Sequence, residues 1–423
     1  MKDERNRYLD LLLAIVLPLL TFAQGWYTQT SGTNKSLFDV HFVDTQNGWI
    51  ASMTNSIFYT SDGGQTWVDL EPQPSVNYWG IYFVTILEGY AVGSPGKIRH
   101  TTDAGITWED QTGGDYNNWG VYFLDENSGW IAGGREEGFP GQDPIRYIYH
   151  TSNGGDNWTA QLYDFDELQL WAVHFFDADI GYAVGDGGTI FHTTNGGGAW
   201  LEQTSGTIRH LRSVHATSPD TAWAVGVGGL VLRTIDGGST WDSLYVGVSY
   251  GLSDIYFVNY QTGWIAGGDT INGIILSTTN AGDSWVLQNS GTSNFLYAIY
   301  FTDPDTGWAV GYDGTIVHTT SGGTGIEELS DFTKPQSEVV LTQNNPNPFS
   351  RSTVISFTMP KTSRVELKVY DLIGQEVAIL VDEELYAGEH AVIFDGKNLP
   401  NGVYFYRLTS GDITKTKLCV LLR

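Results

Sequence analysis

A phrase that recurs at an almost constant interval is the feature that most constrains the fold of this chain. Copies such as "TSDGGQTW" and "TIDGGSTW" close on a tryptophan six times, and the steps between these tryptophans are 41, 50, 42, 41 and 44 residues. The six are Trp67, Trp108, Trp158, Trp200, Trp241 and Trp285. A repeat of this length is typical of folds built from many copies of one small supersecondary unit.

A second marker, glycine or alanine followed by an aromatic residue, raises the count of repeats to seven. It occurs at residues 48–49, 89–90, 129–130, 181–182, 222–223, 263–264 and 307–308. The first unit reads as four short strands near residues 37–44, 48–52, 56–61 and 66–70, separated by turn residues. Four antiparallel strands per repeat make a propeller blade. We therefore predict an all-β chain with a seven-bladed β-propeller over residues 24–325.

The seventh copy of the phrase, "TTSGGTG" at Thr319–Gly325, lacks its tryptophan. The segment "WYTQTSGT" that begins at Trp26 matches "WLEQTSGT" after the fourth copy, but no such phrase precedes it. We therefore predict that Trp26 completes the seventh repeat and that the N-terminal strand closes the ring, which removes two exposed sheet edges.

The phrase itself has an architectural explanation. An Asp or Asn side chain at its third position can accept hydrogen bonds from amides of the turn, the glycines permit positive φ, and the tryptophan buries a large surface. The third-position residues are Asp62, Asp103, Asn153, Asn195, Asp236 and Asn280. The phrase resembles the Asp-box or BNR repeat. Together with "GWAVG" and "GTIVHTT" (307–311 and 314–320), it resembles propellers of the plant and cyanobacterial photosystem II assembly factor family.

That resemblance implies a fold and leaves the function open, because Asp boxes also occur in sialidases, xyloglucanases and sortilin-type receptors. Internal symmetry helps to choose candidates: a residue present in every unit serves the architecture, whereas one that breaks the pattern is a better functional candidate. At the starts of the innermost strands, flat aromatic rings that could stack on sugars or cations give way to Arg212 in one unit. The ligand-binding candidates are Trp79, Trp119, Trp171, Arg212 and Tyr297. Their alternative role is as wedges between blades.

A glycoside hydrolase is an alternative prediction. The third unit carries an insertion over residues 133–147, and Asp164, Asp166 and Glu167 follow nearby, so a pair of carboxylates could act on the same face. Nothing in the spacing selects two of these three acids. We find no metal-ligand spacing, phosphate-binding glycine loop or nucleophile elbow, and therefore expect no metal and no cofactor.

The N-terminal residues 1–23 predict a secretory signal peptide. A short basic start precedes the apolar run Leu11–Ala23, which is too short to span a bilayer comfortably. We therefore expect no transmembrane segment in the mature chain.

Charge and cysteine content exclude other classes. From Gln24 to Gly325 the chain has 32 acidic and 8 basic residues, a balance of −24, so nucleic acid would be repelled. Cys419 is the only cysteine, so no intramolecular disulfide framework exists.

The last 85 residues form a separate unit. After a polar linker at 326–338, alternating β segments with turns at Gly374, Gly388 and Gly402 predict a small immunoglobulin-like β-sandwich over 339–423. The segment resembles the type A C-terminal sorting domain of the type IX secretion system of Bacteroidetes. The matching stretches are 346–349, 369–371, 374–377 and 402–404. The resemblance implies the secretion machinery as a partner and a protein that is secreted or held on the outer surface of a Gram-negative bacterium.

These observations together predict an exported propeller that binds a glycan or a protein without catalysis, through the face opposite the Asp boxes. The glycoside hydrolase and a structural cell-envelope scaffold without a small ligand are the alternatives.

Overall fold

The computed structural model describes residues 25–423 except 71–75, 114–115, 136–143, 167, 245, 270, 325–338, 342, 345–346, 362, 386–387, 398, 412 and 423. The predicted signal peptide and linker therefore lie outside the described residues. So do the middle of the insertion in the third unit and the candidate Glu167.

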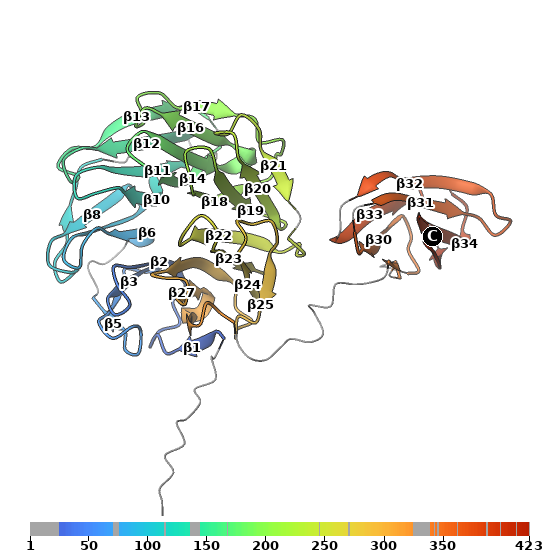
Figure 1. The fold of residues 1–423 in the computed structure, drawn as a ribbon, viewed down its shortest axis with the longest axis horizontal. Coiled ribbons are helices and arrows are strands. Elements are labelled where there is room, and N and C mark those ends of the chain that lie inside the picture. Colours follow the sequence, from blue (N-terminus) through green and yellow to red (C-terminus); the bar gives the residue numbers. More distant parts are fainter. Residues whose placement is uncertain are drawn as a thin grey trace, which may run out of the picture.

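Antiparallel four-stranded sheets make up the part of the chain before residue 321, and seven of them occur among the described residues (Figure 1). In order from first to fourth strand, the first four are β2 (Leu37–Phe42), β3 (Gly48–Ser52), β4 (Ile57–Thr60) and β5 (Val68–Asp69); β6 (Asn77–Phe83), β7 (Gly89–Ser94), β8 (Lys97–Thr101) and β9 (Glu109–Asp110); β10 (Asn117–Phe123), β11 (Gly129–Arg135), β12 (Ile145–Thr151) and β13 (Thr159–Asp164); and β14 (Leu170–Phe175), β15 (Ile180–Gly185), β16 (Ile190–Thr194) and β17 (Leu201–Gln203).

The remaining three sheets follow the same order. They are β18 (Leu211–Ala216), β19 (Ala222–Gly226), β20 (Leu230–Thr234) and β21 (Asp242–Leu244); β22 (Gly251–Phe257), β23 (Gly263–Gly268), β24 (Gly273–Thr278) and β25 (Val286–Gln288); and β26 (Leu296–Phe301), β27 (Thr306–Gly311), β28 (Ile316–Thr320) and β1 (Tyr27–Gln29). Two 3₁₀ turns, η1 (Asp186–Gly188) and η2 (Tyr312–Gly314), interrupt the hairpins of the fourth and seventh sheets.

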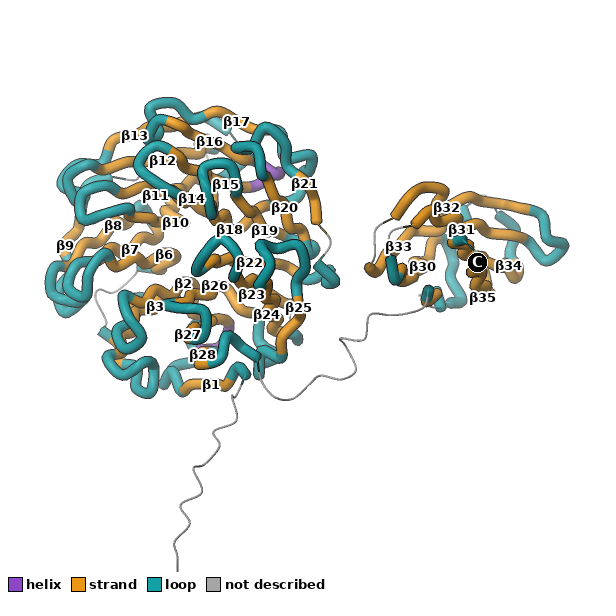
Figure 2. Tube along the Cα trace, in the orientation of Figure 1, coloured by secondary structure: helices purple, strands orange, loops and turns teal. Residues whose placement is uncertain are grey.

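The sheets follow one another around a common centre. The first strand of each sheet contacts the first strand of the next, and β26 contacts β2, so the succession returns to its start. Figure 2 shows β2, β6, β10, β14, β18, β22 and β26 gathered nearest the centre, with the fourth strands at the periphery.

The expected pairing of the N-terminal strand is present. β1 pairs antiparallel with β28, with Tyr27 opposite His318 and Gln29 opposite Ile316. The first repeat has the same arrangement. Val68, the residue after the closing Trp67, lies opposite Tyr59, just as Tyr27, the residue after Trp26, lies opposite His318. Trp26 is 6% exposed, and its ring meets Phe301 edge-on at 5.7 Å. Trp67 meets Phe42 in the same way at 6.0 Å.

Hydrophobic cores lie between neighbouring sheets, and the second marker explains how they form. In six of the seven sheets the aromatic residue of the marker stacks on a phenylalanine from the first strand of the next sheet, as Trp49 does on Phe83 at 3.6 Å and Trp308 on Phe42 at 3.6 Å. The glycine beside it is required, because a Cβ on Gly48 would collide with the Phe42 ring. Each such stack adds about 0.5–1.5 kcal/mol beyond the surface it buries.

The segment after residue 338 forms two further sheets around one core. One contains β29 (Val340–Leu341), β30 (Ser352–Met359) and β33 (Gly388–Asp395); the other contains β32 (Glu376–Leu385), β31 (Ser363–Tyr370), β34 (Gly402–Ser410) and β35 (Ile413–Leu421). Phe357, Phe394, Leu367, Tyr406 and Cys419 from both sheets share a buried cluster. Burial raises the pKa of the Cys419 thiol to about 11, so it packs as a small neutral side chain.

Candidate functional site

Strand register separates the two faces of the sheets. In the third sheet Asn117, Gly134 and Arg146 lie side by side at one end, and Phe123, Gly129 and Thr151 at the other. The turn after Thr151 carries Asn153, so the Asp-box turns and the starts of the first strands lie on opposite faces. We call the face that carries the strand starts the mouth face.

The ligand-binding candidates lie together on the mouth face. Consecutive ring centroids are 5.0 Å apart for Trp79 and Trp119 and 4.4 Å apart for Trp119 and Trp171. The Arg212 guanidinium lies 4.2 Å from the Trp171 ring centroid, a cation–π contact. Tyr297 joins the row through a ring that was not among the candidates, because Phe38 lies 4.9 Å from Tyr297 and 4.5 Å from Trp79.

We call this set the outer tier. Its seven members, one from each sheet, are Phe38, Trp79, Trp119, Trp171, Arg212, Ser253 and Tyr297. All are half-buried. Two indoles are fixed by hydrogen bonds, from Trp119 Nε1 to Gln169 Oε1 at 2.8 Å and from Trp171 Nε1 to Asp186 Oδ1 at 2.7 Å. Such fixed aromatic faces are preorganised, which lowers the entropic cost of stacking on a ligand.

A second ring of side chains, the inner tier, lines the cavity three residues further along each first strand. Its members are His41, Tyr82, Tyr122, His174, His215, Tyr256 and Tyr300. Neighbouring centroids lie 4.2 to 5.4 Å apart around the circle, and Tyr300 returns to His41 at 4.6 Å. Burial lowers the pKa of His41 to about 3 and of His215 to about 4, so both rings are neutral at physiological pH.

The two tiers line a cavity of about 430 Å³, to which all seven sheets contribute residues. This volume is within the range of small-molecule sites. Its walls combine aromatic faces with many polar side chains, so it can hold a flat ligand surface and orient polar groups of the ligand.

Two aspartates in the wall of this cavity were missed by the sequence reasoning. Asp39 and Asp254 stand just after the outer-tier position on β2 and β22, where the other first strands carry Gly80, Gly120, Ala172, Ser213 and Ala298. They break the symmetry of the repeats, and that alone could have revealed them. Burial raises the pKa of Asp39 to about 8 and also raises that of Asp254.

Asp164 and Asp166, the two candidate catalytic carboxylates within the described residues, do not line this cavity. Asp164 and Asp166 each place an oxygen 3.2 Å from Nη2 of Arg146, a buried arginine on β12. Glu202 lies 3.7 Å from the same nitrogen. The structure thus joins Asp164 and Asp166 in one ion-pair network.

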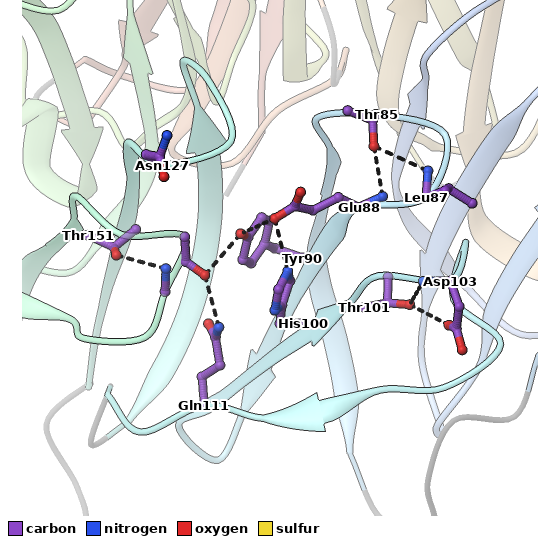
Figure 3. Close-up of polar contacts among 12 residues, drawn as sticks. Thr85, Leu87, Glu88, Tyr90, His100, Thr101, Asp103, Gln111, Asn127 and Thr151 are labelled. Carbon is purple, nitrogen blue, oxygen red and sulfur yellow. Dashed lines mark hydrogen bonds and ion pairs between the residues drawn. The ribbon is translucent and has the colours of Figure 1, made fainter.

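Histidines on the third strands serve separate packing sites. His100 stacks on Tyr90 at 4.6 Å, and its Nε2 lies 3.2 Å from Glu88 Oε1 (Figure 3). The Tyr90 hydroxyl also donates to the Gly154 carbonyl of the next sheet at 3.0 Å. His192 stacks on Tyr182 in the same manner in the fourth sheet. Among the described residues, no group of three His, Cys, Asp or Glu side chains could hold a metal ion.

The Asp-box turns have the hydrogen bonds of a structural motif. The Thr66 amide donates to Asp62 Oδ1 at 2.8 Å, the Thr66 hydroxyl donates to Oδ2 at 2.7 Å, and the Gly64 amide donates to Thr60 Oγ1 at 2.8 Å. Gly64 has a φ of +85°, and a Cβ there would collide with the Gln29 side chain. The polar groups of the turn thus find their hydrogen-bond partners within the motif itself.

A glutamine three residues after the closing tryptophan, also missed from the sequence, joins neighbouring sheets. Gln111 Nε2 donates to the Gly154 carbonyl at 3.1 Å, and its Oε1 accepts from Trp158 Nε1 at 3.1 Å (Figure 3 shows the first bond). The same position holds Gln29, Gln161, Gln203 and Gln288, but Leu70 and Leu244 in two repeats. The regular spacing was the available signal.

None of the helices in the described ranges is long and apolar enough to cross a membrane.

Family comparisons place both parts of the chain. Residues 20–166 and 158–248 match the family described as photosynthesis system II assembly factor YCF48. Together these two ranges cover more than half of the chain. Residues 345–421 match the secretion system C-terminal sorting domain, and such a domain implies a protein that is secreted or displayed on the cell surface. No curated protein matches the chain.

Solved structures share the sheet arrangement. "YCF48 bound to D1 peptide" is 22% identical with a TM-score of 0.58, and the match covers 71% of this chain and 100% of that one. YCF48 from Cyanidioschyzon merolae is 20% identical with a TM-score of 0.57, covering 70% and 98%. The GH74 xyloglucanase from Xanthomonas campestris is 10% identical with a TM-score of 0.55, covering 79% of this chain and 59% of that one.

Proposed function

The chain belongs to the photosynthesis system II assembly factor YCF48 family, and from this premise we propose that it is an exported, noncatalytic binding protein. Its seven four-stranded sheets are the blades of a propeller closed by the N-terminal strand, and the cavity of the mouth face holds a glycan or protein ligand. The C-terminal unit is an immunoglobulin-like sandwich that directs type IX secretion to the outside of a Gram-negative cell.

The observation that carries this proposal is the open cavity that the outer tier lines. Trp79, Trp119 and Trp171 present adjoining aromatic faces, and the cavity beneath them has a volume of about 430 Å³. Aromatic rings with fixed orientation contribute large contact areas at low entropic cost. A purely architectural wedge would not require this open volume.

Exposed apolar side chains around the mouth face support a ligand larger than the cavity. Phe165, Ile208, Ile271 and Tyr312 lie in connections at the strand-start end and are 56–88% exposed. Exposed bulky apolar side chains can form interaction surfaces, and these four lie on the same face as the cavity. The D1 peptide of the related structure indicates that one member of this family binds a peptide.

The glycoside hydrolase remains the second candidate because the xyloglucanase shares the fold. Asp164 and Asp166 are both held in ion pairs with the Arg146 guanidinium and are not among the residues that line the cavity. This contact supports binding over catalysis.

An array of glycans and of peptides, probed with the purified chain, tests the binding proposal. Trp119→Ala and Trp171→Ala should reduce the signal at least tenfold, since each removes one stacking face. If both variants bind as strongly as the wild-type protein, the mouth face is rejected as the site. Reducing-sugar release by the wild-type protein that disappears on Asp166→Asn would instead support the hydrolase. The absence of any ligand across both arrays would favour the scaffold.

A further inference from the structure

The two aspartates that line the cavity mark the chemistry of its ligand. Between the outer and inner tiers, five first strands carry Gly, Ala or Ser, which leave space, while β2 and β22 carry Asp39 and Asp254. The sheets of β2 and β22 are separated by the seventh sheet, whose residue at this level is Ala298. Both residues line the cavity and are half-buried.

Each carboxyl group is held in place by backbone amides. Asp39 Oδ2 accepts from the Ile81 amide of the next sheet at 2.8 Å, and Oδ1 accepts from the Val40 amide at 2.8 Å. Asp254 Oδ2 accepts from the Ile299 amide at 2.9 Å. Its Oδ1 accepts from the Ile255 amide at 2.9 Å and from the Ser213 hydroxyl at 2.7 Å. The carboxyl groups are thus oriented without a ligand.

Ion pairs among the described residues do not balance these two carboxyl groups, although the Arg212 guanidinium also lines the cavity. Among the described residues, the ion pairs with Lys, Arg or His include neither Asp39 nor Asp254. The pKa of Asp39 is raised chiefly by burial and further by the charge of Asp254. A cation in the cavity would supply the missing charge and favour ionisation of both groups.

The walls above the aspartates also suit a cation. The electron-rich faces of Trp79, Trp119 and Trp171 attract an ammonium or guanidinium group, and Arg212 already makes this contact with Trp171 at 4.2 Å. An aromatic funnel with carboxylates at its base is the arrangement that recognises organic cations. A neutral sugar would use the rings and leave both aspartates uncompensated.

We infer that the cavity binds an organic cation, a primary ammonium or guanidinium group, whose charge lies between Asp39 and Asp254 and whose stem passes along the tryptophan faces. The inference rests on the proposed binding function and names its ligand class. The cation can be a free amine or the side chain of a lysine or arginine in a protein partner.

Titration of the wild-type protein tests this inference, because burial raises the pKa of Asp39 to about 8 and Asp39 must ionise to pair with a cation. The other titratable groups that line the cavity are His41, His174, His215, Tyr82, Tyr122, Tyr256, Tyr297, Tyr300 and Arg212. Burial lowers the pKa of the three histidines and raises that of the five tyrosines, so they are neutral near pH 7. Cation binding should therefore release a proton from the aspartates, and affinity should rise up to about tenfold per pH unit below pH 8.

Isothermal titration calorimetry of the full chain measures affinity and proton release. The ligands are n-butylammonium, methylguanidinium, n-butanol and a neutral oligosaccharide. At pH 6, 7 and 8, in buffers of different ionisation enthalpy, both cations should bind with proton release and n-butanol should not. A lysine- or arginine-containing peptide that binds more tightly than either small cation identifies a side chain as the natural source, and equal affinity identifies a free amine.

Asp39→Asn and Asp254→Asn should each weaken cation binding at least tenfold. Asp103→Asn, the same change in a turn on the opposite face, should have no effect. Cation affinity that is independent of pH and of both cavity variants would overturn the inference, as would the absence of cation binding. If the neutral oligosaccharide then binds in a manner that Trp119→Ala abolishes, the proposed function stands and only the ligand class is wrong.

Discussion

Trp26 Nε1 donates a 2.8 Å hydrogen bond to Gln288 Oε1, which lies 262 positions further along the chain. Gln288 Nε2 in turn donates to the Gly322 carbonyl in the unfinished seventh phrase at 2.9 Å. The N-terminal tryptophan therefore occupies the place that Trp241 occupies in its own repeat, where Trp241 donates to Gln203 at 2.9 Å. The first and last segments of the propeller are joined by the same contact that joins its middle.

Trp26→Ala should consequently lower the free energy of unfolding by about 3–5 kcal/mol, the usual loss for a large buried aromatic residue. Trp241→Ala, its counterpart within the chain, should cost a similar amount. All 15 tryptophans lie between residues 26 and 308, so tryptophan fluorescence during denaturation reports this part alone. A loss below 1 kcal/mol for Trp26→Ala would show that the N-terminal strand does not complete the seventh sheet.

The Asp-box turns allow a comparison that the repeats themselves supply. Asp103 accepts a hydrogen bond from the Thr107 amide at 2.8 Å and another from the Thr107 hydroxyl at 2.6 Å. Asp103→Ala should cost about 1 kcal/mol per lost bond, because such bonds contribute modestly in an exposed turn. Asp103→Asn should cost less, since Asn153, Asn195 and Asn280 fill this position in other repeats. Equal losses for both variants, measured by chemical denaturation, would contradict this explanation.

Asp39 predicts how stability changes with pH. Its pKa is about 8 in the folded protein and near 4 when the chain is unfolded, so between these values the folded state binds more protons. The contribution of Asp39 to the free energy of unfolding is therefore fully present below pH 4 and is lost as the pH rises to 8. The difference in melting temperature between Asp39→Asn and wild type should therefore become more positive from pH 5 to pH 9.

Asp103 provides the control with the opposite sign. Hydrogen bonds from Thr107 lower the pKa of Asp103, so its contribution is present above pH 4 and is lost only on acidification. Asp103→Asn should show no trend from pH 5 to pH 9. A constant melting difference for Asp39→Asn over the same range would mean that Asp39 is ionised throughout.

Export should depend on the C-terminal unit. A chain that ends at Ser337 lacks the sorting domain and should remain in the periplasm of a native host, whereas the full chain with Asp103→Asn should reach the outside. Fractionation with surface proteolysis measures both. Surface display of the truncated chain would contradict the assignment.

Repetition explains how far the sequence predicted the structure. The spacing of tryptophans and of the Gly-Trp markers predicted the sheets, and the truncated phrase predicted the partner of Trp26. Trp79, Trp119 and Trp171 were expected on one face and are in contact there. These features depend on strand period and turn position, which are local properties of the chain.

The cavity aspartates depend on geometry that the period does not encode. Within "LFDVHF" Asp39 looks like a member of an ordinary alternating strand, but the register of β2 against β3 shifts between Leu37 and Asp39. That bulge interrupts the alternation, and both Phe38 and Asp39 line the cavity. The ion pairs of Asp164 and Asp166 likewise depend on Arg146, which lies within the insertion of the third unit, where the repeat offers no counterpart.

The most direct test of the binding account compares the two faces of one propeller. Wild-type protein, Trp119→Ala and Asp103→Asn, each confirmed as folded by fluorescence, would be titrated with the ligand that the arrays identify. We predict that Trp119→Ala weakens binding at least tenfold while Asp103→Asn binds as wild type does. Undiminished binding by Trp119→Ala together with loss in Asp103→Asn would place the site on the Asp-box face and contradict the account.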